Sequence, residues 1–235
     1  MNLKPPSRPG PDKAILPLLC NGDRMSQPEF HRRYEAYPPH EKFELIGGTV
    51  YMASPLRRPH GAYQVHLSGV LFLYKSGTPG VEGTDNATVI LGEESEPQPD
   101  LALRILAECG GQSRVNEEEY LEGPPELLAE IAYSSRALDL NQKRQDYERA
   151  GVLEYLVLSI EGPEVYWFHF PSDKQIRPDR AGVSRSLVFP GLWVHLQALF
   201  EQDGPRLIET VQRGLASRPH AAFVRRLQAA RRRSQ

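Results

Sequence analysis

Residues 126–133 have the sequence ELLAEIAY, an apolar run on both faces of an extended chain apart from its acidic residues. A run of this length and composition predicts a buried strand in the interior of a sheet. Glu130 stands inside this run, where an unpaired carboxylate would be strongly destabilising. We therefore expect a partner that holds the charge of Glu130.

Two other residues are placed to lie near Glu130. Asp100 stands at the start of the apolar run 101–105, and Lys143 belongs to a helix that we predict over residues 140–150. Two carboxylates and a lysine on neighbouring elements are typical of a metal-dependent phosphodiesterase. Carboxylate oxygens suit Mg²⁺, and a lysine beside the metal can orient or deprotonate a water and stabilise negative charge. Asp100 and Glu130 are thus candidate metal ligands, with Lys143 as a further catalytic candidate.

Each of these residues also has an ordinary explanation. Asp100 alone fits a turn residue, since it follows a proline. Lys143 alone fits the solvated side of a helix. Glu130 is harder to explain in this way, although an ion pair with Arg144 stays open.

Four more residues are weaker candidates. Glu44 interrupts an apolar strand beside the turn Gly47–Gly48, where it could reach the same metal or simply lie on an exposed hairpin face. His60, in the first turn of a predicted helix, could contact phosphate or cap that helix. Gln98 could position a water or a base, or be loop surface. Tyr147 lies four residues after Lys143 on the same helix face and is a candidate for substrate binding.

The remaining pattern predicts an α/β fold, with a central mixed sheet flanked by helices and a cleft at the strand ends. Hydrophobic periodicity and turn residues support helices and strands that we expect in this order: a short helix to about residue 37, a hairpin over 42–52, a helix over 59–75, strands near 81–83, 87–91, 100–105 and 126–133, a helix over 140–150, strands over 154–160, 164–170 and 184–189, and a short helix near 196–200. Residues 108–123 are expected to form a loop with a short acidic helix.

Composition limits the function classes. The chain has 235 residues, a formal net charge of −2 and 40% hydrophobic residues, which is enough for one sizeable core. Two cysteines without zinc-ligand spacing indicate neither a disulfide framework nor structural zinc. The sequence shows neither a secretory signal pattern nor an apolar run long enough for a bilayer, so we expect a soluble, cytoplasmic protein that does not bind membranes.

The two ends differ from the middle. Residues 1–24 are rich in proline, and we expect an extended, poorly packed leader. From Val211 onward there is no acidic residue, while arginines accumulate. Residues 221–233 can form an amphipathic helix, whose arginines either contact phosphates or only solubilise a frayed end. We therefore divide the chain into an N-terminal extension (1–24), a main domain (25–200) and a basic C-terminal extension (201–235).

The order and spacing of these motifs resemble the Uma2 (DUF820) family of restriction endonucleases over roughly residues 25–200. The matching motifs are the hairpin 43–48, His60, the segment 98–100, the strand 126–131, and the segment 139–155 with its Asp139, Lys143 and Tyr147. The resemblance implies the PD-(D/E)XK nuclease fold, the restriction-endonuclease-like core, with Asp100 and Glu130 as its two carboxylates and Glu44 as an early glutamate.

The chain departs from the ordinary motif in two places. That motif puts a lysine two residues after the second acid, where this chain has Ala132, so the resemblance implies that Lys143 on the following helix takes its place. The turn at 133–135 also lacks the proline that relatives show.

From these observations we expect an endonuclease that uses Mg²⁺, with Mn²⁺ as a substitute, to hydrolyse DNA. A catalytically silent relative that binds nucleic acid or a protein stays open, as does a nuclease for RNA or branched substrates. A homodimer also stays open.

Overall fold

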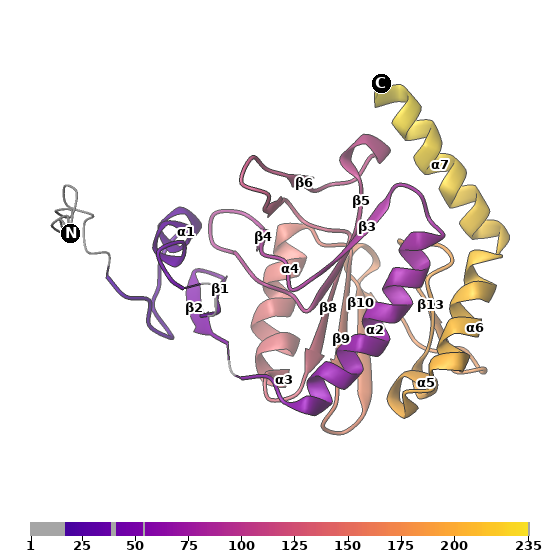
Figure 1. Cartoon of the computed structure of the whole chain (residues 1–235), viewed down its shortest axis with the longest axis horizontal. Helices are drawn as coiled ribbons and strands as arrows, with labels where there is room; N and C mark the ends of the chain where they lie inside the picture. The colour runs from indigo at the N-terminus through magenta and orange to yellow at the C-terminus, as the bar shows by residue number, and fades with distance from the viewer. Residues whose placement is uncertain (1–16, 39–40, 54, 235) are drawn as a thin grey trace, which may run out of the picture.

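The computed structural model of the chain describes residues 17–38, 41–53 and 55–234. Its centre is a six-stranded mixed sheet with the order β11-β10-β9-β8-β5-β3 (Figure 1). The strands of this sheet are β3 (Val81–Asp85), β5 (Leu101–Ile105), β8 (Leu127–Ala132), β9 (Glu154–Ser159), β10 (Glu164–His169) and β11 (Lys174–Gln175). The predicted α/β fold with a central mixed sheet is therefore confirmed.

Strands β8 and β9 form the middle of the sheet and every residue of both is buried. They run parallel, whereas the other neighbouring pairs are antiparallel. A parallel pair needs a crossover connection, and the helical segment between residues 136 and 150 provides it. This connection brings the helix that carries Lys143 directly after the strand that carries Glu130.

Helices cover both faces of the sheet (Figure 1). Alternate strand residues such as Leu101 and Leu103 pack with α2 (Arg58–Ser76), α5 (Leu196–Glu201) and α6 (Gly204–Leu215). The intervening residues, such as Ala102, pack on the opposite face with α4 (Arg144–Ala150). The period of two along each strand thus divides the core into two apolar layers.

The N-terminal part forms a small unit beside the sheet. Helix α1 (Gln27–Tyr34) packs on the hairpin of β1 (Phe43–Ile46) and β2 (Thr49–Met52), which forms as predicted. Residues 1–16 of the expected leader lie outside the described residues. Its last residues do pack, because Leu19 is buried in the same cluster as Phe30. The expectation of a poorly packed leader is therefore wrong for residues 17–24.

Some short elements differ from the prediction. The expected acidic helix within residues 108–123 does not form. The short helix η1 (Ala107–Cys109) precedes two short strands, β6 (Arg114–Val115) and β7 (Leu121–Glu122), which form a small sheet with β4 (Val89–Ile90) from an earlier part of the chain. The expected strand over 184–189 is shorter. It ends at Arg185 in β12 (Val183–Arg185), which pairs with β13 (Trp193–His195).

The C-terminal residues form two helices, α6 and α7 (Arg218–Ser234), whose apolar residues join the main core. Phe223 and Leu227 of α7 pack against the region of Cys109 that follows β5. The end of the chain is thus a packed helix. Among the described residues, no helix is both long enough and apolar enough to cross a lipid bilayer.

Candidate active site

The register of two neighbouring strands brings Asp100 to Glu130. Leu101 pairs with Ala129 in the antiparallel ladder of β5 and β8, so the residue before β5 lies opposite Glu130. The backbone N–H of Asp100 donates to Glu130 Oε2 at 3.4 Å, and the N–H of Ile131 donates to Asp100 Oδ2 at 2.7 Å. Asp100 and Glu130 are 8% and 5% exposed. The two acids predicted to share a site therefore lie side by side.

The helical segment after β8 is irregular where it meets these acids. A short helix α3 (Arg136–Leu138) leads into a π-helical turn, η2 (Asp139–Lys143), and α4 follows. Such turns are rare and are frequent at functional sites. In this one, both Asp139 and Lys143 are buried.

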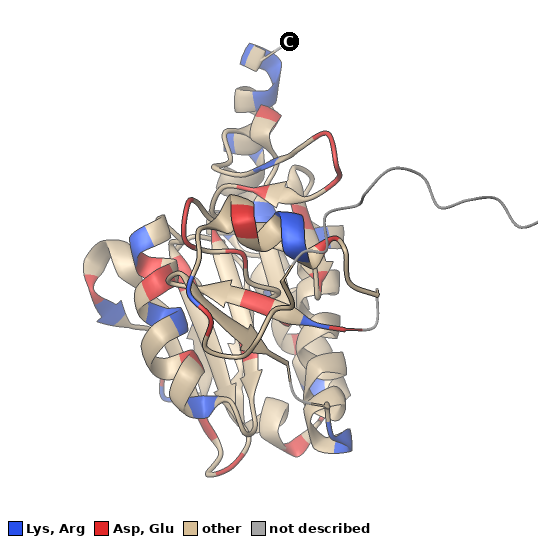
Figure 2. Cartoon of the chain, turned by 90° about the vertical axis from the view of Figure 1, so that its left-hand side faces the viewer, with Lys and Arg blue, Asp and Glu red and all other residues tan. Residues whose placement is uncertain are grey.

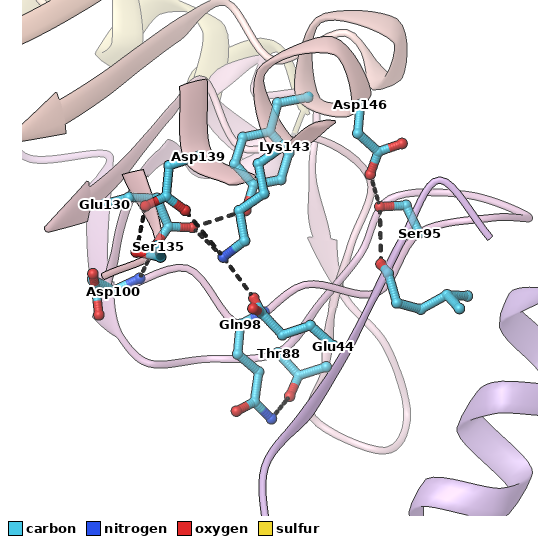
Figure 3. Close-up of polar contacts among 12 residues, drawn as sticks. Glu44, Thr88, Ser95, Gln98, Asp100, Glu130, Ser135, Asp139, Lys143 and Asp146 are labelled. Carbon is cyan, nitrogen blue, oxygen red and sulfur yellow. Dashed lines mark hydrogen bonds and ion pairs between the residues drawn. The ribbon is translucent and has the colours of Figure 1, made fainter. Parts of the chain in front are cut away.

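Lys143 lies between two carboxylates from distant parts of the chain (Figure 3). Its Nζ is 2.9 Å from Glu130 Oε1 and 2.9 Å from Glu44 Oε1, and 4.0 Å from Asp139 Oδ1. The lysine is only 4% exposed. The ordinary alternative, in which Lys143 lies on the solvated side of a helix, is therefore excluded, and Lys143 is the cation that pairs with Glu130.

The hairpin positions Glu44 for this contact. Leu45 exchanges backbone hydrogen bonds with Glu96, which ties β1 to the segment leading into Asp100. The backbone N–H of Gln98 donates to Glu44 Oε1 at 2.8 Å. Glu44 is thus held between Gln98 and Lys143, and its place on an exposed hairpin face is ruled out by a side chain only 12% exposed.

Burial and like charges control the electrostatics. Burial raises the pKa of Glu130 well above its ordinary value, and Asp100, Asp139 and Glu44 raise it further, while Lys143 opposes them. Burial alone would lower the pKa of Lys143, but the surrounding carboxylates, Glu130 first, raise it above its ordinary value. Lys143 therefore carries a positive charge that the carboxylates need.

Two further polar residues contact the acids. His60 Nε2 lies 3.2 Å from Asp100 Oδ2, and the imidazole is buried at the first turn of α2. Tyr147 donates its hydroxyl proton to Glu130 Oε1 at 2.9 Å. Burial raises the pKa of Tyr147 well above its ordinary value, so the hydroxyl stays a donor. The structure therefore brings Glu44, His60, Tyr147 and the three main candidates into one cluster.

Two predicted roles need correction. Tyr147 is fully buried against Tyr155, so it positions Glu130 and cannot contact substrate in this structure. The side-chain amide of Gln98 donates to Tyr34 and Thr88 at 3.1 and 2.9 Å, so it links α1 to the residue before β4. The alternative partner of Glu130, Arg144, instead lies over the ring of Phe168.

Asp139 belongs to the matched segment 139–155, but we predicted no catalytic or metal-binding role for it. Its Oδ2 accepts from Ser135 at 2.6 Å, while its buried Oδ1 has no hydrogen-bond partner among the described residues. Burial raises the pKa of Asp139 to about 6. The four-residue spacing between Asp139 and Lys143 was the available signal, since it places both side chains on one side of a helical turn.

The donor set fits a hard divalent cation. Asp100, Glu130 and Asp139 offer oxygen ligands, and the unpartnered Oδ1 of Asp139 leaves one buried oxygen unused. Glu44 lies across the ammonium group from Glu130 (Figure 3). The ligand atoms of Asp100, Glu130 and Asp139 do not all lie within 4.8 Å of one another; among the described residues, that spacing occurs only in the surface group of His31, Glu35 and Glu118.

Comparisons with known proteins identify the family and support the fold. The model of the Uma2 family, described as "Putative restriction endonuclease", matches residues 28–198. A solved structure described as a putative nuclease belonging to DUF820 from Anabaena variabilis ATCC 29413 has a TM-score of 0.55 and 14% identity, and the match covers 72% of this chain and 96% of that one. At that identity the likeness shows the fold. No curated protein matches. The family match spans most of the chain, and the chain therefore belongs to the Uma2 family.

Proposed function

We propose that the protein is a Mg²⁺-dependent endonuclease that hydrolyses phosphodiester bonds in DNA. One observation carries this proposal: Glu44, Glu130 and Asp139 lie within 4.0 Å of one buried lysine, and Asp100 lies beside Glu130 where β5 begins. A folded protein rarely gathers like charges in its interior unless a function requires them. The family, described as a putative restriction endonuclease, and the solved DUF820 structure, described as a putative nuclease, support a nuclease.

Asp100 and Glu130 would hold the metal, with Asp139 beside them. When bound, Mg²⁺ would neutralise phosphate charge and make a bound water more acidic. Glu44 is fixed by Gln98 and would act through Lys143 or through a water. The proposal assigns Mn²⁺ as a substitute, because its ligand preferences are similar.

The side chains around these acids have separate tasks. Lys143 is positively charged and directed at Glu130, so it is suited to orienting a water and stabilising negative charge on phosphate. Its raised pKa makes it a poor proton acceptor. Tyr147 and the N–H of Asp100 fix Glu130, and His60 fixes Asp100. These contacts preorganise the acids before substrate arrives.

A second function is favoured by one specific observation. Lys143 already neutralises Glu44 and Glu130 directly, so the acids are stable without metal. In this alternative the charged cluster only stabilises the fold and binds no metal. The protein would then be a catalytically silent family member that binds nucleic acid or a protein partner without cleavage.

A nicking assay separates the two functions. Purified protein is incubated with supercoiled plasmid in Mg²⁺, in Mn²⁺ and in EDTA, beside linear duplex, branched DNA and RNA. We expect metal-dependent nicking that is absent in EDTA and in Asp100→Asn and Glu130→Gln. Cleavage that is equal in wild type and both variants would indicate a contaminating nuclease and contradict the proposal. Binding without cleavage of any substrate would support the silent alternative.

A further inference from the structure

The C-terminal helix α7 differs in charge from the rest of the molecule (Figure 2). It holds six arginines, no lysine and no acidic residue. Because the chain has 28 basic and 30 acidic residues in total, the remainder has 22 basic and 30 acidic residues and a formal charge of −8. The positive charge of α7 is therefore a local feature on an acidic protein.

The arginines of α7 are arranged by the way the helix packs. Phe223 and Leu227 are 3% and 2% exposed and face the core. At about 100° per residue, Arg225 lies roughly 160° from both of them, on the outward side. Arg218 and Arg232 are each seven residues from Arg225, which is close to two helical turns. These three exposed arginines form an outward row about 21 Å long.

The outward row has no acidic partner within the described residues, whereas two of the other three arginines of α7 make side-chain contacts. Arg231 lies 4.0 Å from Glu108, and Arg226 lies over the ring of Phe223. Among the described residues, no acidic side chain lies within ion-pair distance of Arg218, Arg225 or Arg232. The row therefore presents uncompensated charge to the surroundings.

We propose that the outward face of α7 binds the phosphate backbone of nucleic acid without reading its sequence. Arginine guanidinium groups pair with phosphate oxygens through two hydrogen bonds, and α7 uses arginine at every basic position. A row of about 21 Å faces several phosphates, because duplex DNA carries one charge per about 1.7 Å of its axis.

A lipid surface fits this face less well. Helices that lie on membranes insert an apolar face between lipids. The large apolar residues of α7, Phe223 and Leu227, are already buried against the protein. An anionic membrane would therefore contact only the arginines of α7, with no large apolar side chain available to insert between the lipids.

The position of α7 determines what this contact can do. Asp100 precedes β5, whereas α7 packs against η1, which follows β5. In Figure 1 the last turns of α7 and the segment α3 beside the site lie at opposite ends of the molecule. The inference deepens the proposed function by naming a second contact with the same substrate, one that increases affinity and leaves the cleavage step unchanged.

The test compares two triple variants of equal charge. Arg218→Gln, Arg225→Gln and Arg232→Gln remove the row, and the matched control removes three exposed arginines elsewhere, Arg177→Gln, Arg180→Gln and Arg206→Gln. Both sets are made in full-length protein and lower the net charge by three. Binding to a labelled 30-base-pair duplex is measured in EDTA, which prevents cleavage, over a range of salt concentrations.

We expect the α7 variant to bind at least about tenfold more weakly at low salt, for any duplex sequence. Its plot of log affinity against log salt should be less steep by up to about 2.7, because each phosphate contact contributes about 0.9. Helix content by circular dichroism should match the wild type. Single-turnover cleavage at saturating protein should also match it.

Equal affinities and salt slopes for the α7 variant and its control would overturn the inference. So would a loss of binding to vesicles containing anionic phospholipid with duplex binding intact, which would make the face a membrane contact. Failure of the proposed function is distinguishable, because it removes cleavage and leaves the binding difference between the two variants in place.

Discussion

Two buried glutamates on neighbouring parallel strands are held in opposite ways. Glu154 at the start of β9 is fully buried, and its carboxylate receives four hydrogen bonds at 2.6–3.0 Å. The donors are the indole of Trp167, the hydroxyl of Ser186 and the backbone N–H groups of Leu187 and Val188. None of these donors is charged, and together they fix the loop after β12. Glu154 is therefore a structural residue.

Glu130 on β8 has a different environment. Its Oε1 receives Lys143 and Tyr147, while Oε2 has only the long contact with the N–H of Asp100. Asp100, Asp139 and Glu44 add like charges around it. Neutral hydrogen-bond donors are enough to stabilise the buried carboxylate of Glu154. A buried carboxylate surrounded by other carboxylates, such as Glu130, needs a cation for its stability. This difference is the one that we expect between a structural carboxylate, Glu154, and a carboxylate that serves the proposed function, Glu130.

The largest effect is expected from exchanging the two glutamates for glutamine. Glu130→Gln should reduce metal-dependent cleavage at least about 100- to 1000-fold, because it removes charge from the metal site. Its unfolding free energy should stay the same or rise, since it relieves like-charge repulsion. Glu154→Gln should leave cleavage per folded molecule unchanged. It should lower the unfolding free energy by about 2–4 kcal/mol, because the side-chain NH₂ of glutamine would replace one carboxylate oxygen and point at groups that themselves donate hydrogen bonds. Denaturant unfolding measures the stability of each variant, and a nicking assay measures its cleavage rate. Loss of cleavage in Glu154→Gln together with normal cleavage in Glu130→Gln would contradict the roles assigned to the two glutamates.

Lys143 tests whether the acids depend on its charge. Lys143→Met should abolish cleavage and lower the unfolding free energy by about 3–5 kcal/mol in EDTA, because it leaves buried carboxylates unpaired. Adding Mg²⁺ should restore part of that loss. Arg144→Met is the control on the next residue and should cost less than about 1 kcal/mol, since Arg144 only stacks on Phe168. A Lys143→Met protein as stable as wild type in EDTA would show that the acids are neutral.

The raised pKa of Asp139 should make the stability of the folded protein depend on pH. Its pKa is raised from 3.8 to about 6 in the folded protein, so the folded state keeps a proton that the unfolded state releases. Stability in EDTA should therefore fall as pH rises from about 4 to 6, by at most about 3 kcal/mol. Asp139→Asn should make this fall smaller, and the part that remains comes from other buried carboxyl groups with raised pKa values, such as Glu130. Urea unfolding at each pH measures it, and an unchanged slope in the variant would show that Asp139 does not titrate in that range.

Tyr147 should show the smallest effect. Tyr147→Phe removes one hydrogen bond to Glu130 Oε1 and should lower the unfolding free energy by about 1–2 kcal/mol. Because Tyr147 is buried, the apparent affinity for DNA should not change. Weaker DNA binding with unchanged stability would restore the substrate contact that we first predicted.

Local sequence patterns predicted the strands that carry the site. The buried run around Glu130 and the apolar run after Asp100 form β8 and β5 where expected, because long apolar strands have few alternative environments. The hairpin also formed, since the turn at Gly47 and Gly48 has the positive φ angles that its glycines allow.

Other features depend on tertiary contacts and could not be predicted in this way. The burial of Lys143 follows from a π-helical turn, which has no sequence pattern of its own. The contact of Glu44 with Lys143 joins residues 99 apart in the sequence. Helix α6 did have a signal, the four-residue spacing of Leu207, Val211 and Leu215, which we did not interpret. Strands β12 and β13 are too short for a periodic pattern.

The central claim is that the acids around Glu130 bind a divalent cation. Titration of Mn²⁺ followed by electron paramagnetic resonance, in the absence of nucleic acid, tests it most directly. The control is a double variant, Glu35→Gln and Glu118→Gln, which removes the surface group near His31. Both the wild type and this control should bind Mn²⁺ at the buried site. The Asp100→Asn and Glu130→Gln double variant, with an unchanged circular dichroism spectrum, should lose that site. Equal Mn²⁺ binding by the wild type and this double variant would contradict the claim.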